Sequence, residues 1–301
     1  MQLQKEILRL KKERNAVILA HNYQRPEIQD LGDFVGDSLE LARKAQKTEA
    51  DVIVFCGVDF MAETAAIVNP GKTVLLPAWD AMCPMAAMLP PEAIKRAREE
   101  HPEAEVVMYV NTLAAAKAYA DCICTSANAV KVVNSMKADT ILFAPDKNLA
   151  YYVAQRTKKN IIPVPQTGFC IVHENIKLED VLKAKAEHPN AKLTVHPETP
   201  AEVQKIADHI GSTKQMIEYV KSSPDREFII GTEVDIIYRM KKEAPGKSFY
   251  PACQKSICRN MKKITLENLH EALKNMQYRI EVPEKIADAA RKPIERMLAL
   301  P

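Results

Sequence analysis

Three cysteines in this sequence share one local setting. Cys83, Cys170 and Cys258 each follow a short apolar run that includes or ends in proline, at intervals of 87 and 88 residues. A short apolar run bounded by proline or glycine is typical of a buried strand, so each thiol is expected in the loop beyond a strand end. An interval of this length indicates three supersecondary units, each about the size of a small α/β layer.

The setting of these thiols limits the chemistry they could support. Around a common axis, three thiolates would repel one another unless a metal compensated their charge, and soft thiolates select Zn, Cu(I) or iron–sulfur clusters. A structural Zn site favours four ligands, often in Cys-x-x-Cys pairs, and this chain has no such pair. A cubane cluster on three cysteines would leave one iron open as a Lewis acid. The alternative is three inert, buried thiols, as expected for Cys56, Cys122, Cys124 and Cys253, which lack counterparts.

Polar side chains repeat with nearly the same period. Steps of 88 and then 87 residues connect three triplets: Ser38, Ser126 and Thr213; His21, Tyr109 and His196; and Tyr23, Asn111 and Glu198. A single serine or threonine is usually an ordinary helix cap, and a single histidine or tyrosine is usually structural. Three residues in one register favour a shared site instead.

The members of these triplets predict two functions for that site. Ser38, Ser126 and Thr213 are each expected to cap a helix, and three helix N-termini facing one cavity would suit carboxylate or phosphate groups. The histidines, the tyrosines, Glu198 and also His173 supply general acids and bases. Glu233 follows a strand end as well, but its counterpart in the first unit is either Val58 or Asp59, so it is a secondary candidate.

Strands and helices alternate along the chain in the way a parallel sheet requires. Strands are expected at 16–20, 51–55, 73–76, 106–110, 140–143, 161–164, 192–195, 228–231 and 248–250, with helices between them. The predicted fold class is α/β, with three pseudo-threefold-related αβα domains whose parallel sheets surround a central metal site. The expected units are 1–88, 89–173 and 174–261, and the helical residues 262–301 should pack back on the first unit.

Composition excludes several classes of partner. The 301 residues are 47% hydrophobic, and 42 basic and 39 acidic residues give a net charge of +3. Charges of both signs are spread along the chain, so no footprint for nucleic acid or an acidic membrane is expected. No apolar run reaches the length of a membrane span, and the N-terminus resembles no secretion signal. These features predict a cytoplasmic protein whose partners are small anions.

Eight short motifs together resemble the quinolinate synthase family. They are His21-Asn22-Tyr23-Gln24, Gly36-Asp37-Ser38, Cys83-Pro84-Met85-Ala86, Tyr109-Val110-Asn111, Thr125-Ser126-Ala127-Asn128, His196-Pro197-Glu198, Gly211-Ser212-Thr213, and Cys258 followed by Asn260-Met261-Lys262. The match runs nearly from end to end of the chain. Two positions depart from the family pattern: Phe169 stands where histidine is common, and Thr112 where serine is common.

The resemblance implies a [4Fe-4S] cluster on Cys83, Cys170 and Cys258 and a role in NAD biosynthesis. The implied reaction condenses iminoaspartate with dihydroxyacetone phosphate to quinolinate, with release of phosphate and water, and implies an upstream enzyme that produces iminoaspartate. The implied catalytic residues are Tyr23, Glu198, His21, His196 and Tyr109. The implied substrate-binding residues are His21, Ser38, Tyr109, Val110, Asn111, Ser126, His173, His196, Pro197, Glu198 and Thr213.

Two other functions remain open at this point. Radical enzymes of diphthamide synthesis resemble the same plan of three units and three cysteines, but would need a site for S-adenosylmethionine and a protein partner. A non-enzymatic iron–sulfur carrier or sensor would also need the cysteines, but not the buried polar triplets. The motifs from His21 to Tyr23 and from His196 to Glu198 favour the synthase.

Overall fold

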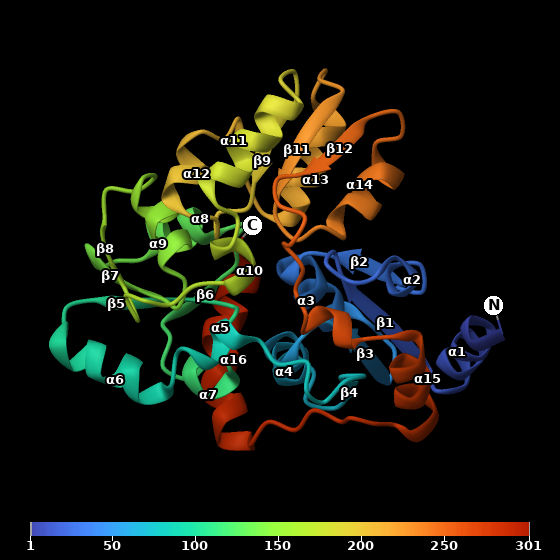
Figure 1. The fold of residues 1–301 in the computed structure, drawn as a ribbon. Coiled ribbons are helices and arrows are strands. Elements are labelled where there is room, and N and C mark those ends of the chain that lie inside the picture. Colours follow the sequence, from blue (N-terminus) through green and yellow to red (C-terminus); the bar gives the residue numbers. More distant parts are fainter. Residues whose placement is uncertain (1, 301) are drawn as a thin grey trace.

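The computed structural model describes residues 2–300, and its chain forms three separate parallel sheets of four strands each (Figure 1). The first sheet contains β1 (Ala16–His21), β2 (Phe34–Gly36), β3 (Val52–Cys56) and β4 (Thr73–Leu75). The second contains β5 (Glu105–Tyr109), β6 (Cys122–Cys124), β7 (Thr140–Ala144) and β8 (Asn160–Pro163). The third contains β9 (Lys192–Val195), β10 (His209–Ile210), β11 (Glu227–Gly231) and β12 (Ser248–Pro251). The predicted α/β class with three αβα layers is therefore confirmed.

Helices connect the strands and flank the sheets. In the first unit they are α1 (Gln2–Glu13), α2 (Pro26–Gln29), α3 (Ser38–Lys47), α4 (Asp59–Val68) and α5 (Pro84–Ala87). In the second unit they are α6 (Pro91–Glu100), α7 (Ala114–Lys117), α8 (Ala129–Ser135), α9 (Lys147–Ala154) and α10 (Ile171–Glu174). The third has α11 (Leu178–Glu187), α12 (Ala201–Lys205), α13 (Thr213–Ser222) and α14 (Ile236–Glu243), followed by the 3-10 turn η1 (Met261–Lys263), α15 (Leu266–Asn275) and α16 (Glu284–Ala299). Each sheet lies inside one predicted unit, while the division into three domains stays a prediction.

All three sheets have the same topology, and this topology determines where a ligand can bind. The strand orders are β2-β1-β3-β4, β6-β5-β7-β8 and β10-β9-β11-β12. In each sheet the second strand of the unit therefore lies on one side of the first strand, and the third strand lies on the other side, which makes a topological switch point between the first and third strands. In parallel α/β sheets, ligands bind outside the carboxyl ends of the strands at this switch point. The residues just after β1, β5 and β9, and those just after β3, β7 and β11, are therefore the ones that can line a site.

The core follows from the alternation of side chains along the strands. In β11, Phe228 and Ile230 point to the face covered by α13 and α14, whereas Ile229 points to the face covered by α11 and α12. All three side chains are buried because helices cover both faces of a parallel sheet.

Two sequence predictions about local structure were wrong. The second strand of each unit, β2, β6 and β10, was missed, since these strands have only 3, 3 and 2 residues. The predicted helix caps also differ. Asp37 and Ser212 cap α3 and α13, and Ser38 and Thr213 are the first helical residues. Ser126 opens no helix, because α8 begins only at Ala129, after Asn128.

The C-terminal helices pack on more of the molecule than predicted. Helix α15 lies against α1, as expected, and residues 278–280 hydrogen-bond to the edge of β4. Helix α16, drawn in red in Figure 1, contacts α3 and α4 of the first unit but also α7 and β6 of the second. It therefore joins two units. In residues 2–300, no helix is both long and apolar enough to cross a membrane.

Candidate active site

One cavity of about 570 Å³ is lined by residues from all three units. The lining includes His21 and Tyr23 after β1, Tyr109 and Asn111 after β5, and His196 and Glu198 after β9. It also includes Ser38, Ser126, Thr213, His173 and the three cysteines in phase, Cys83, Cys170 and Cys258. The structure thus brings the repeated residues to one place. Val110 and Pro197 are buried but are not among the lining residues.

His21 and His196 occupy equivalent positions with the same local geometry. The backbone N–H two residues further on donates to Nδ1 of each ring, from Tyr23 at 3.2 Å and from Glu198 at 3.3 Å. Burial lowers the pKa of both imidazoles to about 3. Both rings are therefore neutral near pH 7, with the proton on Nε2. Nε2 of His196 lies 3.1 Å from the hydroxyl of Ser126, to which it donates.

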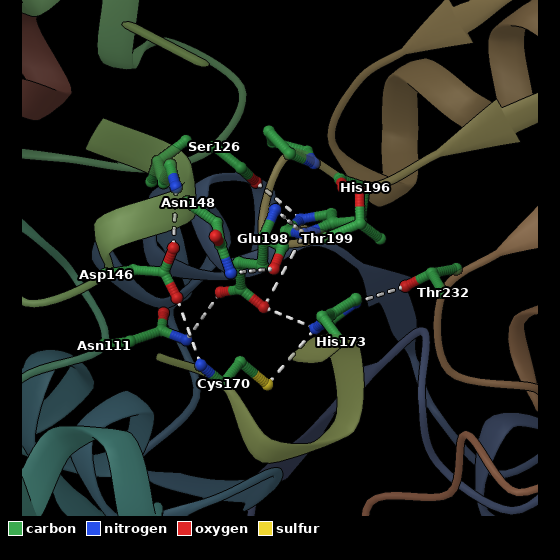
Figure 2. Close-up of polar contacts among 12 residues, drawn as sticks. Asn111, Ser126, Asp146, Asn148, Cys170, His173, His196, Glu198, Thr199 and Thr232 are labelled. Carbon is green, nitrogen blue, oxygen red and sulfur yellow. Dashed lines mark hydrogen bonds and ion pairs between the residues drawn. The ribbon is translucent and has the colours of Figure 1, made fainter. Parts of the chain in front are cut away.

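A chain of hydrogen bonds connects Tyr23 with Glu198 across the cavity. The Tyr23 hydroxyl lies 2.6 Å from Oγ1 of Thr232, and Thr232 lies 2.8 Å from Nε2 of His173. Nδ1 of His173 is 2.7 Å from Oε2 of Glu198. Figure 2 shows this chain from Thr232 through His173 to Glu198. Thr232 was not predicted as a site residue, although it follows β11 directly.

Glu198 is the buried carboxylate at the centre of the site. Burial acts to raise its pKa, but the nearby His173 and His196 outweigh that effect and lower the pKa to about 2. The carboxylate also accepts hydrogen bonds from the Tyr109 hydroxyl and, at 3.5 Å, from Nδ2 of Asn111. Burial and the charge of Glu198 raise the pKa of Tyr109. The site therefore holds an ionised carboxylate beside protonated phenols near pH 7.

The residues expected to bind anions are connected across two units. Ser212 donates to Asp37 at 3.1 Å, so the caps of α13 and α3 contact each other. Nδ2 of Asn22 donates to Oγ1 of Thr213 at 2.7 Å. The first turns of both helices border the cavity through Ser38 and Thr213. Lys255 and Arg259 also line the cavity and are exposed, which adds positive charge near Cys258.

The three cysteines in phase are free thiols that line the cavity and lie near one another. Burial raises the pKa of each thiol. Sγ of Cys170 is 3.2 Å from Nδ1 of His173, and Cys170, His173 and Glu198 form a group able to hold a metal ion. Cys56, Cys122 and Cys124 are fully buried, and Cys253 packs against the core of the third unit.

Several residues of the site were missed or underrated from the sequence. Glu233 lines the cavity, is fully buried, and forms an ion pair with Lys262 at 2.8 Å. A stricter test of the period would have found it, since Glu233 lies 87 residues after Asp146. The two departures from the family pattern are both accommodated: the Thr112 hydroxyl donates to the carbonyl of Tyr109, and the Phe169 ring lies under the Lys147 ammonium.

Comparison with known proteins identifies the family. The sequence model of the family described as quinolinate synthetase A protein matches residues 5–299. The chain belongs to the quinolinate synthase family. It is 57% identical over 300 residues to a quinolinate synthase from Pyrococcus horikoshii, which covers 100% of this chain and 99% of that protein. It is 56% identical over 298 residues to one from Methanoregula boonei, covering 99% and 98% of the two chains. The quinolinate synthase from Pyrococcus abyssi is 57% identical over 300 residues, with 100% of both chains covered. Membership in this family, along nearly the whole chain, favours the synthase over the diphthamide enzymes and the carrier.

Proposed function

We propose that this enzyme condenses iminoaspartate with dihydroxyacetone phosphate to form quinolinate. One observation carries the proposal: in a member of the quinolinate synthase family, a single cavity combines three free thiols with an acid–base set from three repeated units. One four-carbon and one three-carbon substrate give the seven carbons of quinolinate, and the balanced reaction releases one phosphate and two molecules of water. The upstream supplier would be an enzyme that produces iminoaspartate.

We propose that Cys83, Cys170 and Cys258 hold a [4Fe-4S] cluster. Each unit contributes one free thiol to the same cavity. This supports the proposal, because iron–sulfur clusters are held by cysteine thiolates. Burial opposes ionisation of these thiols in the protein alone, so a cationic group is needed to hold them as thiolates. When bound, the cluster would supply an open iron that acts as a Lewis acid.

The polar residues of the cavity suit two anionic substrates. The first turns of α3 and α13 present Ser38 and Thr213, and helix N-termini favour carboxylate and phosphate. The neutral His21 can donate from Nε2 without adding a fixed charge. Nε2 of His196 already donates to Ser126, so the Ser126 hydroxyl is left free to donate to a substrate. Oδ1 of Asn111 is buried without a hydrogen-bond partner among the described residues, so a substrate N–H or O–H could donate to it.

Proton transfer is assigned to Tyr23 and Glu198. Tyr23 is a protonated phenol, because burial raises its pKa, and it can act as an acid; Glu198 is ionised and can act as a base. The chain through Thr232 and His173 allows a proton taken by Glu198 to return to Tyr23 on the other side of the cavity. Ring formation needs protons to be removed and returned several times, so a connected acid and base are suited to it. Tyr109 would orient Glu198 through its hydroxyl.

The test combines metal analysis with turnover. Protein purified without oxygen should contain iron and sulfide, and should form quinolinate when dihydroxyacetone phosphate and freshly generated iminoaspartate are both supplied. Omitting either substrate should abolish the product. Protein that contains the cluster but forms no quinolinate from the two substrates would instead support a cluster carrier.

A further inference from the structure

Three buried or half-buried carboxylates contact the loops that carry the cavity cysteines. Asp59, Asp146 and Glu233 follow the third strand of their sheets and lie 87 residues apart. Asp59 accepts the backbone N–H of Cys83 at 2.9 Å, Asp146 that of Cys170 at 3.1 Å, and Glu233 that of Cys258 at 3.3 Å. Figure 2 shows the contact in the second unit, from Asp146 to the nitrogen of Cys170.

A second backbone bond ties each loop two residues before its cysteine. The N–H of Asp59 donates to the carbonyl of Ala81 at 2.9 Å. The equivalent bonds join Lys147 to Gly168 at 2.8 Å and Val234 to Ser256 at 3.0 Å. In each unit, therefore, the segment after the third strand holds the cysteine loop at two points, once through its backbone and once through a carboxylate.

The carboxylates are themselves fixed in place. Oδ1 of Asp146 accepts the N–H of Leu149 and caps α9. Oε2 of Glu233 accepts the N–H of Asp235, and Lys262 forms an ion pair with Oε1. Oδ1 of Asp59 accepts the N–H of Phe60 besides that of Cys83. A rigid acceptor restricts the loop that donates to it more than a mobile one would.

The loop of the second unit also has no room to move closer. A Cβ atom on Gly168 would lie 2.0 Å from the carbonyl oxygen of Pro145, the residue next to Asp146. A separation below 3.0 Å cannot be tolerated without a shift of the backbone. Glycine is therefore required where this loop meets the segment after β7.

We propose that Asp59, Asp146 and Glu233 are positioning residues that fix the three cysteine loops before a cluster binds. The inference rests on the proposed function, because the loops matter only if their thiols share one cluster. Residues that orient metal ligands through hydrogen bonds typically change metal affinity by about 10- to 100-fold when they are replaced. Holding the loops in advance also removes part of the conformational entropy that binding would otherwise lose.

A second set of repeated carboxylates provides the matched control. Asp33 accepts the N–H of Ile18 at 2.8 Å, and Asp121 and Asp208 make the same contact to Val106 and Leu193. These contacts lie near the N-terminal ends of β1, β5 and β9, whereas the cavity lies at the C-terminal ends of the same strands. They tie strands in the way the first set ties cysteine loops, so Asp33→Ala removes a comparable bond far from the thiols.

The experiment compares Asp59→Ala, Asp59→Asn, Asp146→Ala and Asp33→Ala. Asp59→Asn can keep Oδ1 as an acceptor for both of its N–H donors, so it should behave nearly as wild type. Iron and sulfide per chain, and the rate at which a chelator removes iron, are measured after anaerobic reconstitution. We expect Asp59→Ala and Asp146→Ala to lose iron about 10- to 100-fold faster, and Asp33→Ala to lower only the melting temperature.

A measurement without the cluster separates this inference from the proposed function. In cluster-free protein, hydrogen exchange of the Cys83 amide should speed up in Asp59→Ala and stay unchanged in Asp59→Asn and Asp33→Ala. Unchanged exchange at Cys83, or iron loss as fast in Asp33→Ala as in Asp59→Ala, would overturn the positioning role. Wild-type protein that binds no cluster would overturn the proposed cofactor, while the exchange data would still show whether the carboxylates hold the loops. Asp146→Ala, read in the same way at Cys170, provides the result if the Asp59→Ala protein does not fold.

Discussion

Replacing Glu198 with glutamine should abolish most of the activity while leaving the fold intact. The carboxylate has two oxygens, and donors approach both: Nδ1 of His173 lies 2.7 Å from Oε2, and Nδ2 of Asn111 lies 3.5 Å from Oε1. Tyr109 donates to the same carboxylate. Glutamine replaces one oxygen with an NH₂ group that cannot accept, so in either orientation at least one buried donor loses its partner.

The expected size of the effect follows from these contacts. An unpaired buried donor costs about 1–3 kcal/mol, which appears as reduced stability. Loss of the base itself costs more in rate, because a positioned proton acceptor contributes about 10²- to 10⁴-fold. We therefore expect kcat to fall by at least about 100-fold, with a melting temperature only a few degrees lower.

The assay measures quinolinate formed under anaerobic conditions at saturating substrates, together with iron per chain. Glu174→Gln is the matched control: Glu174 accepts hydrogen bonds from Lys147 and Asn148 close to the site but does not line the cavity. This control should keep near wild-type activity. A Glu198→Gln enzyme with full iron content and a kcat within about threefold of wild type would contradict the argument, since 10²-fold is the least a positioned base supplies.

Four further predictions concern the same cavity. Tyr23→Phe should lower kcat by about 100-fold or more with iron unchanged. Thr232→Val should lower kcat less, because the Tyr23 hydroxyl would still lie 3.5 Å from Nε2 of His173. Equal rates in both variants and wild type would exclude proton transfer along the chain from Tyr23 to Glu198. Serine in place of any cavity cysteine should abolish the cluster absorbance, whereas the same change at Cys56, Cys122, Cys124 or Cys253 should leave it; retention in the Cys170 variant would contradict the assignment. Ser126→Ala should raise KM or lower kcat/KM by roughly ten- to a hundredfold, because a charge-assisted hydrogen bond contributes about 1.5–3 kcal/mol; unchanged kinetics would leave Ser126 as an ordinary loop residue. His21 and His196 have folded pKa values of about 3, below the ordinary 6.5. The stability that each contributes is therefore complete above pH 6.5 and is lost as the pH falls toward 3, by up to about 1.4 kcal/mol per pH unit each. If the melting temperature of a His196→Gln protein fell with acid as steeply as that of wild type, this ring would not titrate as argued.

The long strands could be predicted from the sequence because their apolar runs carry a clear signal. The prediction of 192–195 coincides with β9, that of 16–20 is one residue short of the end of β1, and that of 51–55 is shifted by one residue from β3. The edge strands β2, β6 and β10 gave no such signal. They contain 3, 3 and 2 residues, which is too short for a period to be detected. Their pairing is imposed by the neighbouring strand and not by their own composition.

The residues of the cavity were found mainly because they repeat, and the omissions come from the same source. The step of 88 residues connects the first unit to the second as far as Ser38 and Ser126. By Asp59 and Asp146 the step is 87, because the second unit is one residue shorter than the first between these points. The counterpart of Glu233 in the first unit was therefore left open between Val58 and Asp59, and its relation to the other carboxylates was missed. Ser126 was placed at a helix start because its counterparts lie there. In the second unit, however, the side chain of Asn128 accepts the N–H of Thr125 and forms a turn before α8.

The three units agree in the residues that hold the backbone and differ in those that line the cavity. In every unit, carboxylates accept backbone N–H groups near the strand starts and in the cysteine loops. In every unit a lysine also donates to a backbone carbonyl: Lys72, Lys159 and Lys247. At the cavity, by contrast, the equivalent residues are His21, Tyr109 and His196 in one layer and Tyr23, Asn111 and Glu198 in the next. The proposed cluster would use the symmetry, because each unit contributes one thiol. The proposed condensation of two different molecules would use the asymmetry, because an acid, a base and an amide must each face a different atom. On this proposal, the threefold repeat explains the cysteine site and the substitutions within it explain the chemistry.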